Sequence, residues 1–136
     1  MVGLDYGNAR LRAMRSRLLS AADYDGLVGT DSMDGLISGL AATAYASDVD
    51  AALPRFTGLR QLDEIVRHHM VRVLGPLPSY YENPRDGVVG LLTDRWDLHN
   101  LRTLFRVKSR FEATDEMLRR MVPIGRLGAA ELNELA

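Results

Sequence analysis

Apolar residues recur at helical spacing along nearly the whole chain, and this pattern constrains the fold more than any other feature. Leu59, Leu62, Val66, Met70 and Val73, for example, fall on one face of a helix. No window of four or more residues alternates apolar and polar side chains as a half-buried strand does. We therefore predict an all-α fold, a compact multi-helix domain.

Cap and breaker residues divide this pattern into segments. Ser, Thr and Asp are typical residues at helix starts, and Gly and Pro at helix ends. A loop is expected at residues 78–85, where Tyr80, Tyr81 and Asn83 stand among prolines. On these grounds we predict helices over residues 5–20, 32–45, 47–54, 57–77, 86–110, 114–121 and 128–136, and a short helix or turn over 23–29. Thr30 or Asp31 is expected to cap the segment 32–45, and Ser47 the segment 47–54.

Composition excludes several classes of protein. The chain has 136 residues, the size of one domain or of a piece of a longer protein. It has 0 cysteines, so disulfides, thiolate nucleophiles and cysteine zinc sites are excluded. The net charge is -1, which gives no overall field to collect nucleic acid or acidic lipid. No apolar run is long enough to span a bilayer and no secretory signal is visible, so we predict a cytosolic protein without membrane insertion.

The first predicted helix carries two stripes. Its larger apolar residues form one stripe, and a second stripe of small residues lies opposite, which allows packing on both sides. Arginines flank the stripes, and their long stems can cover apolar surface while the guanidinium groups reach water. Packing between domains or subunits is the role we expect for Arg10, Arg12, Arg15 and Arg17.

The predicted helix over 86–110 is apolar almost all the way round, which is typical of a central, buried helix. Asp94 and Asp97 are close enough on it to share acid and base work. However, we prefer an ion-pair cluster at a helix bend, formed with Arg95, Arg102 and Lys108.

The histidines do not suggest chemistry. His68 and His69 are adjacent on a helix, so their side chains point about 100° apart and cannot chelate one metal together. His68 is placed to pair with Glu64, and His99 is also interpreted as structural or solvated. No phosphate-binding loop or nucleophile motif is present. We therefore expect no catalytic residue, no cofactor and no metal site.

Three stretches resemble a known family. Tyr6–Leu19 (YGNARLRAMRSRLL) looks like the opening of the C subunit of the V-type and A-type rotary ATPases, called the d subunit in eukaryotes. Leu91–Lys108 (LLTDRWDLHNLRTLFRVK) is similar to the helix of that family with an Arg-Trp-Asp and Asn-Leu pattern, and carries its mixed motif at Trp96, Asp97, Asn100 and Arg106. Val122–Leu127 (VPIGRL) matches the turn into the family's second helical unit.

The resemblance implies a helical funnel of three similar units, of which this chain covers the first third. Residues 1–121 would form the first helical domain, and 122–136 the start of the second, cut short. The implied protein is a non-catalytic coupling subunit that joins the central shaft of the ATPase to the membrane rotor ring. It would serve ATP-driven ion transport or ATP synthesis, peripheral on the cytoplasmic face. Asp97 and Asn100 are expected to be structural.

Two other functions stay open at this point. The chain could be a stand-alone helical module that docks another helix on an exposed apolar face. Nucleic-acid binding is the third possibility, but acidic residues are as numerous as basic ones and no aromatic side chains are interleaved with the arginines.

Overall fold

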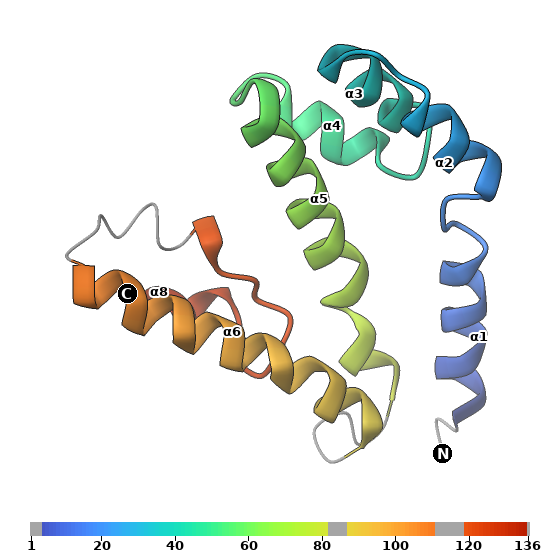
Figure 1. The fold of residues 1–136 in the computed structure, drawn as a ribbon. Helices are drawn as coiled ribbons and strands as arrows, with labels where there is room; N and C mark the ends of the chain where they lie inside the picture. Colours follow the sequence, from blue (N-terminus) through green and yellow to red (C-terminus); the bar gives the residue numbers. More distant parts are fainter. Residues whose placement is uncertain (1–3, 82–86, 111–118, 136) are drawn as a thin grey trace. The chain divides into compact units, whose positions relative to one another are not determined.

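The protein is helical, as its periodicity predicts. The computed structural model describes residues 4–81, 87–110 and 119–135, and within these ranges it contains no strand. Most of the helix predicted over 114–121 lies outside the described residues. The elements are α1 (Leu4–Arg15), α2 (Ala21–Val28), α3 (Met33–Ala41), α4 (Ala46–Ala52), α5 (Gly58–Leu74), the 3-10 helix η1 (Leu77–Tyr80), α6 (Val88–Arg110) and α8 (Ala129–Leu135), shown in Figure 1.

The helix boundaries differ from the prediction where serine caps act. α1 ends at Arg15 instead of Ser20, because Ser20 caps α2. The Ser20 hydroxyl accepts from the Asp23 backbone N–H at 3.2 Å, and the Asp23 carboxylate accepts from the Ser20 N–H at 2.7 Å. These two bonds form a capping box, which stabilises the start of a helix. The pKa of Asp23 is lowered by the bond from the Ser20 N–H and by a bond that the Ser20 hydroxyl donates to the same carboxylate at 2.7 Å.

Three further local predictions were wrong. Ser32 caps α3 in place of Thr30 or Asp31, accepting from the Gly35 N–H at 3.1 Å. The residue before α4 is Tyr45, with no side-chain cap, so Ser47 does not cap that helix. The segment predicted as a loop after residue 77 begins with η1, which proline at its first turn favours.

The chain divides into two compact units: a first unit of residues 8–72, and a second unit of residues 1–7 and 73–136. In the first unit, α3 and α4 lie beside α5, with α2 next to α3 (Figure 1). The core of this unit is formed by Ile37, Leu40, Val49, Ala52 and Ile65.

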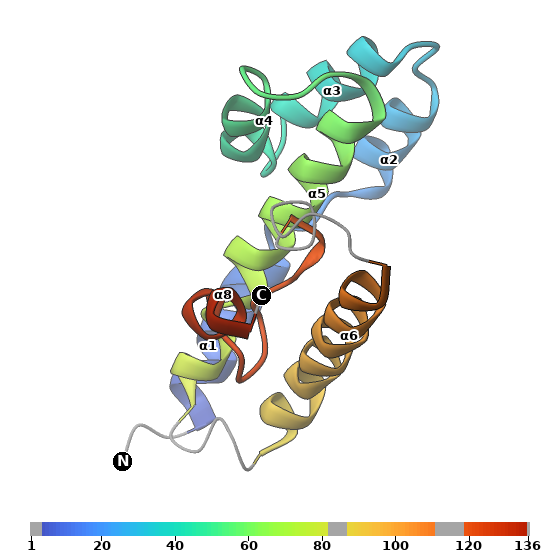
Figure 2. The ribbon, with the colours of Figure 1, turned by 90° about the vertical axis from the view of Figure 1, so that its left-hand side faces the viewer.

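The second unit is built on α6. The turn that precedes α8, and α8 itself, lie on one side of α6 (Figure 2). Leu104 and Val107 of α6 are buried against Met121 and Leu132. Burial of these aliphatic side chains stabilises the unit by roughly 1.5–3 kcal/mol per residue.

The prediction of a central, buried α6 was wrong. Its apolar residues do lie all round the helix, but five of them are exposed: Val88, Leu91, Leu92, Leu98 and Phe105. The larger stripe of α1 is exposed as well, at Leu4 and Leu11. Periodicity identifies apolar faces, but it does not say whether a neighbour covers them. Among the described residues, no helix combines the length and the apolar character needed to cross a membrane.

Gly7 of α1 lies close against Tyr81, in the segment after η1. It is buried, and a Cβ at this position would overlap the ring of Tyr81. The neighbouring pair, Tyr6 and Tyr80, meets edge to face with ring centroids 6.3 Å apart. The aromatic packing at this end of the second unit therefore requires glycine at position 7.

We predict that Gly7→Ala lowers the free energy of unfolding of the second unit by about 1–2 kcal/mol, because the Tyr81 ring must move. Denaturant unfolding followed by fluorescence of Trp96, the single tryptophan, measures this unit. Gly26→Ala, in the first unit, is a control for an added methyl group in open space and should leave the Trp96 midpoint unchanged, since nothing lies within 4 Å of the added Cβ. Equal midpoints for Gly7→Ala and the unmodified protein would contradict the steric role.

Candidate functional site

Two polar clusters are candidates for a functional site, one in each unit. The cluster of the second unit joins α6 to the turn at residues 122–127. The Asp97 carboxylate accepts backbone N–H bonds from Arg126 at 2.8 Å and from Leu127 at 3.1 Å. The Asn100 amide group donates to the Val122 carbonyl oxygen and accepts from the Val122 N–H, both at 2.8 Å. We call these contacts the turn clamp.

Asn100 is the buried centre of the turn clamp. Its side chain has no exposed surface, and Val122 is also buried. A buried backbone N–H and C=O each need a partner, because an unpaired one costs about 1–3 kcal/mol. One amide side chain satisfies both groups of Val122, so the position of the turn on α6 is fixed by hydrogen bonds as well as by apolar packing.

Asp94 holds the same turn from its outer edge. The Arg126 guanidinium donates to both Asp94 oxygens, at 2.9 and 3.2 Å. The predicted ion-pair cluster with Arg95, Arg102 and Lys108 is therefore replaced by a pair with a residue 32 positions away. This pair is exposed and contributes little to stability by itself.

Gly125 makes the close approach possible. A Cβ at residue 125 would overlap the Asp97 carboxylate. A side chain there would push the turn away from α6 and lengthen the bonds at Arg126 and Leu127. The glycine of the VPIGRL segment and the aspartate of the α6 motif are therefore one geometric unit.

The other two motif residues do not join the turn clamp. Trp96 is half-buried, with the Arg95 guanidinium 5.5 Å from its ring centroid and His99 meeting it edge to face at 6.0 Å. Arg106 is exposed. Arg10, Arg12, Arg15 and Arg17 are likewise exposed, on α1 and just after it. Their interface role stays a prediction.

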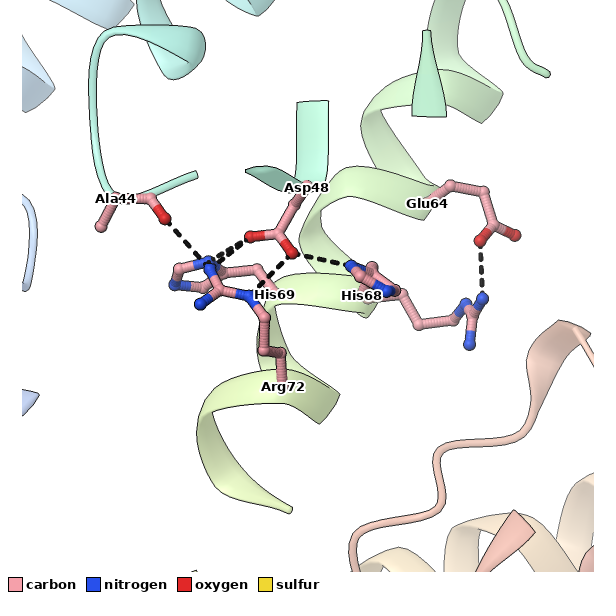
Figure 3. A network of polar contacts seen from close by, with 7 residues as sticks. Ala44, Asp48, Glu64, His68, His69 and Arg72 are labelled. Atoms are coloured by element: carbon pink, nitrogen blue, oxygen red, sulfur yellow. Dashed lines mark hydrogen bonds and ion pairs between the residues drawn. The ribbon is translucent and has the colours of Figure 1, made fainter. Parts of the chain in front are cut away.

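The cluster of the first unit surrounds Asp48 and was not predicted (Figure 3). Asp48 lies on α4 and is 0% exposed. From α5, His68 Nδ1 lies 2.7 Å from Asp48 Oδ1, and His69 Nδ1 lies 2.7 Å from Oδ2. Arg72 donates from Nε to Oδ1 at 3.0 Å and from Nη2 to Oδ2 at 2.7 Å.

The proton positions follow from the charge of Asp48. Burial, the largest single influence, opposes ionisation, but bonds from Arg72, His69 and His68 lower the pKa of Asp48 to about 2. The carboxylate is ionised at neutral pH and can only accept, so both histidines donate from Nδ1. The 3.0 Å approach of Arg72 Nη2 to His69 Nδ1 then joins two donors and is not a hydrogen bond.

The Asp48 carboxylate has no remaining capacity for chemistry. Each oxygen accepts two bonds, which fills the roughly four lone-pair directions of a carboxylate. Arg72 Nη2 also donates to the Ala44 carbonyl at 3.1 Å, and His69 stacks on Tyr45 at 3.7 Å between centroids. A general base needs a free lone pair and a pKa near the working pH. The Asp48 cluster therefore ties α4 to α5 and is not a catalytic centre.

Sequence reasoning missed this cluster and assigned a wrong partner. His68 was expected to pair with Glu64, but Glu64 bonds Arg67 at 2.6 Å. Adjacent histidines cannot chelate one metal ion, but they can share a carboxylate, because each of its two oxygens accepts from one ring. Three hydrogen-bond donors cluster on α5: His68, His69 and Arg72. Such a cluster predicts that a buried acidic residue lies nearby, but it does not identify that residue.

The second unit also has a cavity of about 320 Å³ beside the turn clamp, lined by Gly75, Pro78, Ser79, Gly90, Thr93, Gly125 and Arg126. Its polar groups are engaged locally: Thr93 donates to the carbonyls of Val89 and Gly90, and Ser79 to that of Pro76. Across the described ranges, no group of three or more His, Asp or Glu side chains is arranged to hold a metal ion.

We predict that Asn100→Ala destabilises the second unit by about 2–4 kcal/mol, because both polar groups of Val122 lose their buried partner. Asp97→Ala should cost less, since its oxygens serve half-buried and exposed N–H groups. The Trp96 fluorescence midpoint in denaturant measures both effects. Asn133→Ala, an exposed residue on α8, is the control. A midpoint for Asn100→Ala equal to that of the control would contradict the turn clamp.

We predict that Asp48→Asn destabilises the first unit by about 2–3 kcal/mol at neutral pH, since Arg72 loses its anion but can still reach water. Hydrogen exchange of α3 to α5 amides measures the loss. Asp50→Asn, exposed on the same helix, is the control. Equal protection in the two variants would contradict the role of Asp48.

The same carboxylate gives a pH dependence. Its folded pKa of about 2 lies below the ordinary value, so its stabilisation is present above about pH 4 and is lost as the pH falls toward 2. We expect the first unit to lose about 2 kcal/mol more over this interval than Asp48→Asn does. Parallel acid titrations of the two proteins, followed by circular dichroism, test this; identical acid midpoints would contradict it.

Known proteins resemble this chain over most of its length. Residues 7–136 match the family model described as ATP synthase (C/AC39) subunit. The C subunit of an A-type ATP synthase from Methanocaldococcus jannaschii is 22% identical over 131 residues, which cover 96% of this chain and 33% of the relative. The C subunit of a V-type ATP synthase from Thermus thermophilus is 30% identical over 113 residues, covering 83% of this chain and 33% of the relative.

A third relative, the C subunit of the A-type ATP synthase of Archaeoglobus fulgidus, is 27% identical over 120 residues, covering 86% of this chain and 34% of the relative. The chain spans about a third of the length of the curated relatives it matches. No solved structure gives a significant match. The match over residues 7–136 includes the turn clamp and the Asp48 cluster, and confirms the resemblance seen in the sequence. This chain belongs to the ATP synthase (C/AC39) subunit family.

Proposed function

We propose that this chain is part of a non-catalytic central-stalk subunit of a rotary ATPase, coupling the central shaft to the membrane rotor ring. Family membership over residues 7–136 is the observation that carries the proposal. The polar clusters support a structural role, because their acceptors are filled by fixed donors within each unit. In this proposal the protein serves ATP-driven ion transport or ATP synthesis and lies peripherally on the cytoplasmic face.

The domain arrangement is part of the same proposal. Residues 1–121 would belong to the first of three similar helical units of a funnel, and 122–136 to the start of the second. The turn clamp fits this arrangement, because it fixes where the turn that leads into α8 lies on α6. A part that transmits torque needs such fixed connections between its helices.

The arginines of the first helix are the proposed interface residues. Arg10, Arg12, Arg15 and Arg17 are exposed, and guanidinium groups bind carboxylates through two parallel bonds. Partner subunits with acidic surfaces would therefore be held more firmly by arginine than by lysine. Shaft subunits are the partners we assign to this row.

We predict that reversing all of these arginines to glutamate lowers capture of the shaft subunit by the intact protein at least about tenfold, which equals about 1.4 kcal/mol. The measurement is a quantitative pull-down with purified shaft subunit and rotor ring from the same organism. Arg55→Glu, exposed in the loop before α5, is the control for charge reversal. Unchanged capture would remove the interface role from α1.

A stand-alone binding module is the second candidate, favoured by the exposed apolar residues of α6. The same pull-down separates the two functions. A protein that bridges shaft and ring supports coupling, and one that binds neither supports the binding module.

A further inference from the structure

The outer face of α6 has a regular pattern that the fold leaves uncovered. The inner face of α6, toward the turn and α8, is buried at Thr93, Asn100, Leu104 and Val107. Leu91, Leu98 and Phe105 recur every seven residues on the opposite side, where they are 75%, 50% and 70% exposed. Residues seven apart lie on one side of a helix, so a single partner helix laid along α6 could cover all three. We call the line of these three residues the seam.

One edge of this seam is cationic. Arg95, Arg102 and Arg106 are exposed and follow the seam at spacings of seven and four residues, so they form a row along α6. The acidic residues of this helix do not offset the row, because Asp94 pairs with Arg126 and Asp97 accepts from the N–H groups of Arg126 and Leu127. The outer face therefore combines an apolar seam with positive charge.

This charge distribution discriminates between occupants. A second copy of the chain packed antiparallel along α6 would place the two arginine rows beside each other, and like charges at such flanking positions oppose pairing. α1 is no better matched, since its exposed Leu4 and Leu11 are accompanied by Arg10, Arg12 and Arg15. A helix with an apolar face and acidic residues along its flank could cover the seam and also pair with the arginine row.

We propose that the outer face of α6 docks a partner helix that has apolar residues at seven-residue spacing and glutamate or aspartate along one flank. The apolar residues of the partner would cover Leu91, Leu98 and Phe105, and its carboxylates would bond the guanidinium groups of the row. This inference rests on the binding-module candidate, for which it names the chemistry of the partner, and it does not depend on the coupling function.

Two fluorescent helical peptides of about three heptads test the proposal, with the same leucine seam and with either glutamate or lysine on the flank. Binding to the full chain is measured by anisotropy at low and at high salt. We expect the glutamate peptide to bind at least about tenfold more tightly than the lysine peptide, and more weakly at high salt. Equal binding of both peptides, or of neither, would overturn the proposal.

Variants locate the binding face. Leu98→Ser with Phe105→Ser should abolish binding of the glutamate peptide, while Leu59→Ser, exposed on α5, should leave it intact. Arg102→Glu with Arg106→Glu should reverse the preference toward the lysine peptide. Circular dichroism checks that each variant keeps its helices, and these exposed positions are expected to tolerate the changes.

Two outcomes would assign the surface differently and overturn the proposal. If Arg12→Glu with Arg15→Glu on α1 weakens binding as much as the α6 charge reversal, the peptide is held by positive charge in general. If the chain dimerises and Phe105→Ser abolishes the dimer, the occupant of the face is a second copy. Neither outcome involves shaft or ring subunits, so failure here is distinguishable from failure of the coupling function.

Discussion

The paired hydrogen bonds between Asn100 and the Val122 backbone are the interaction on which the second unit depends. They bring the chain back onto α6 at a fixed residue, with no solvent-exposed surface on the amide. Once the turn is placed there, Met121 and Leu132 reach Leu104 and Val107, and Gly125 admits the Asp97 carboxylate. Apolar contact alone would permit several registers of the turn, whereas one amide paired with one backbone residue selects a single register.

In the first unit, a buried carboxylate instead of an amide fixes one helix against another. Asp48 is an ion in a buried site, and such groups often add less stability than an apolar core of equal volume. The carboxylate instead fixes the position of α4 on α5, because it accepts four hydrogen bonds from three residues of α5. The hydrogen bonds to Asp48, together with its charge, raise the pKa of Arg72, so anion and cation keep each other ionised. In the coupling function that we propose, such bonds of fixed direction would help the unit to hold its shape under load.

Much of the helical architecture could be predicted from the sequence, since α5 and α6 have long and clear periodicity. The capping box at Ser20 and Asp23 could also have been predicted from the sequence. It was missed because the apolar stripe of the first predicted helix favoured extending that helix to Ser20. The polar clusters could not be predicted, because Asp48 and His68, or Asp97 and Arg126, are brought together only by the tertiary fold. Exposure of the outer face of α6 was missed for a related reason: the pattern of one helix contains no information about its neighbours.

The short length of α4 has a consequence for how the first unit opens. A seven-residue helix without a side-chain cap is not stable alone in water, since too few backbone bonds offset the cost of nucleation. The contacts of Asp48 with α5 therefore supply much of what keeps α4 folded. Local fraying of α4 would have to break bonds to two histidines and an arginine at once, so α4 and α5 form one cooperative opening unit. Amide protons of α4 should then exchange with solvent only as fast as those of the middle of α5.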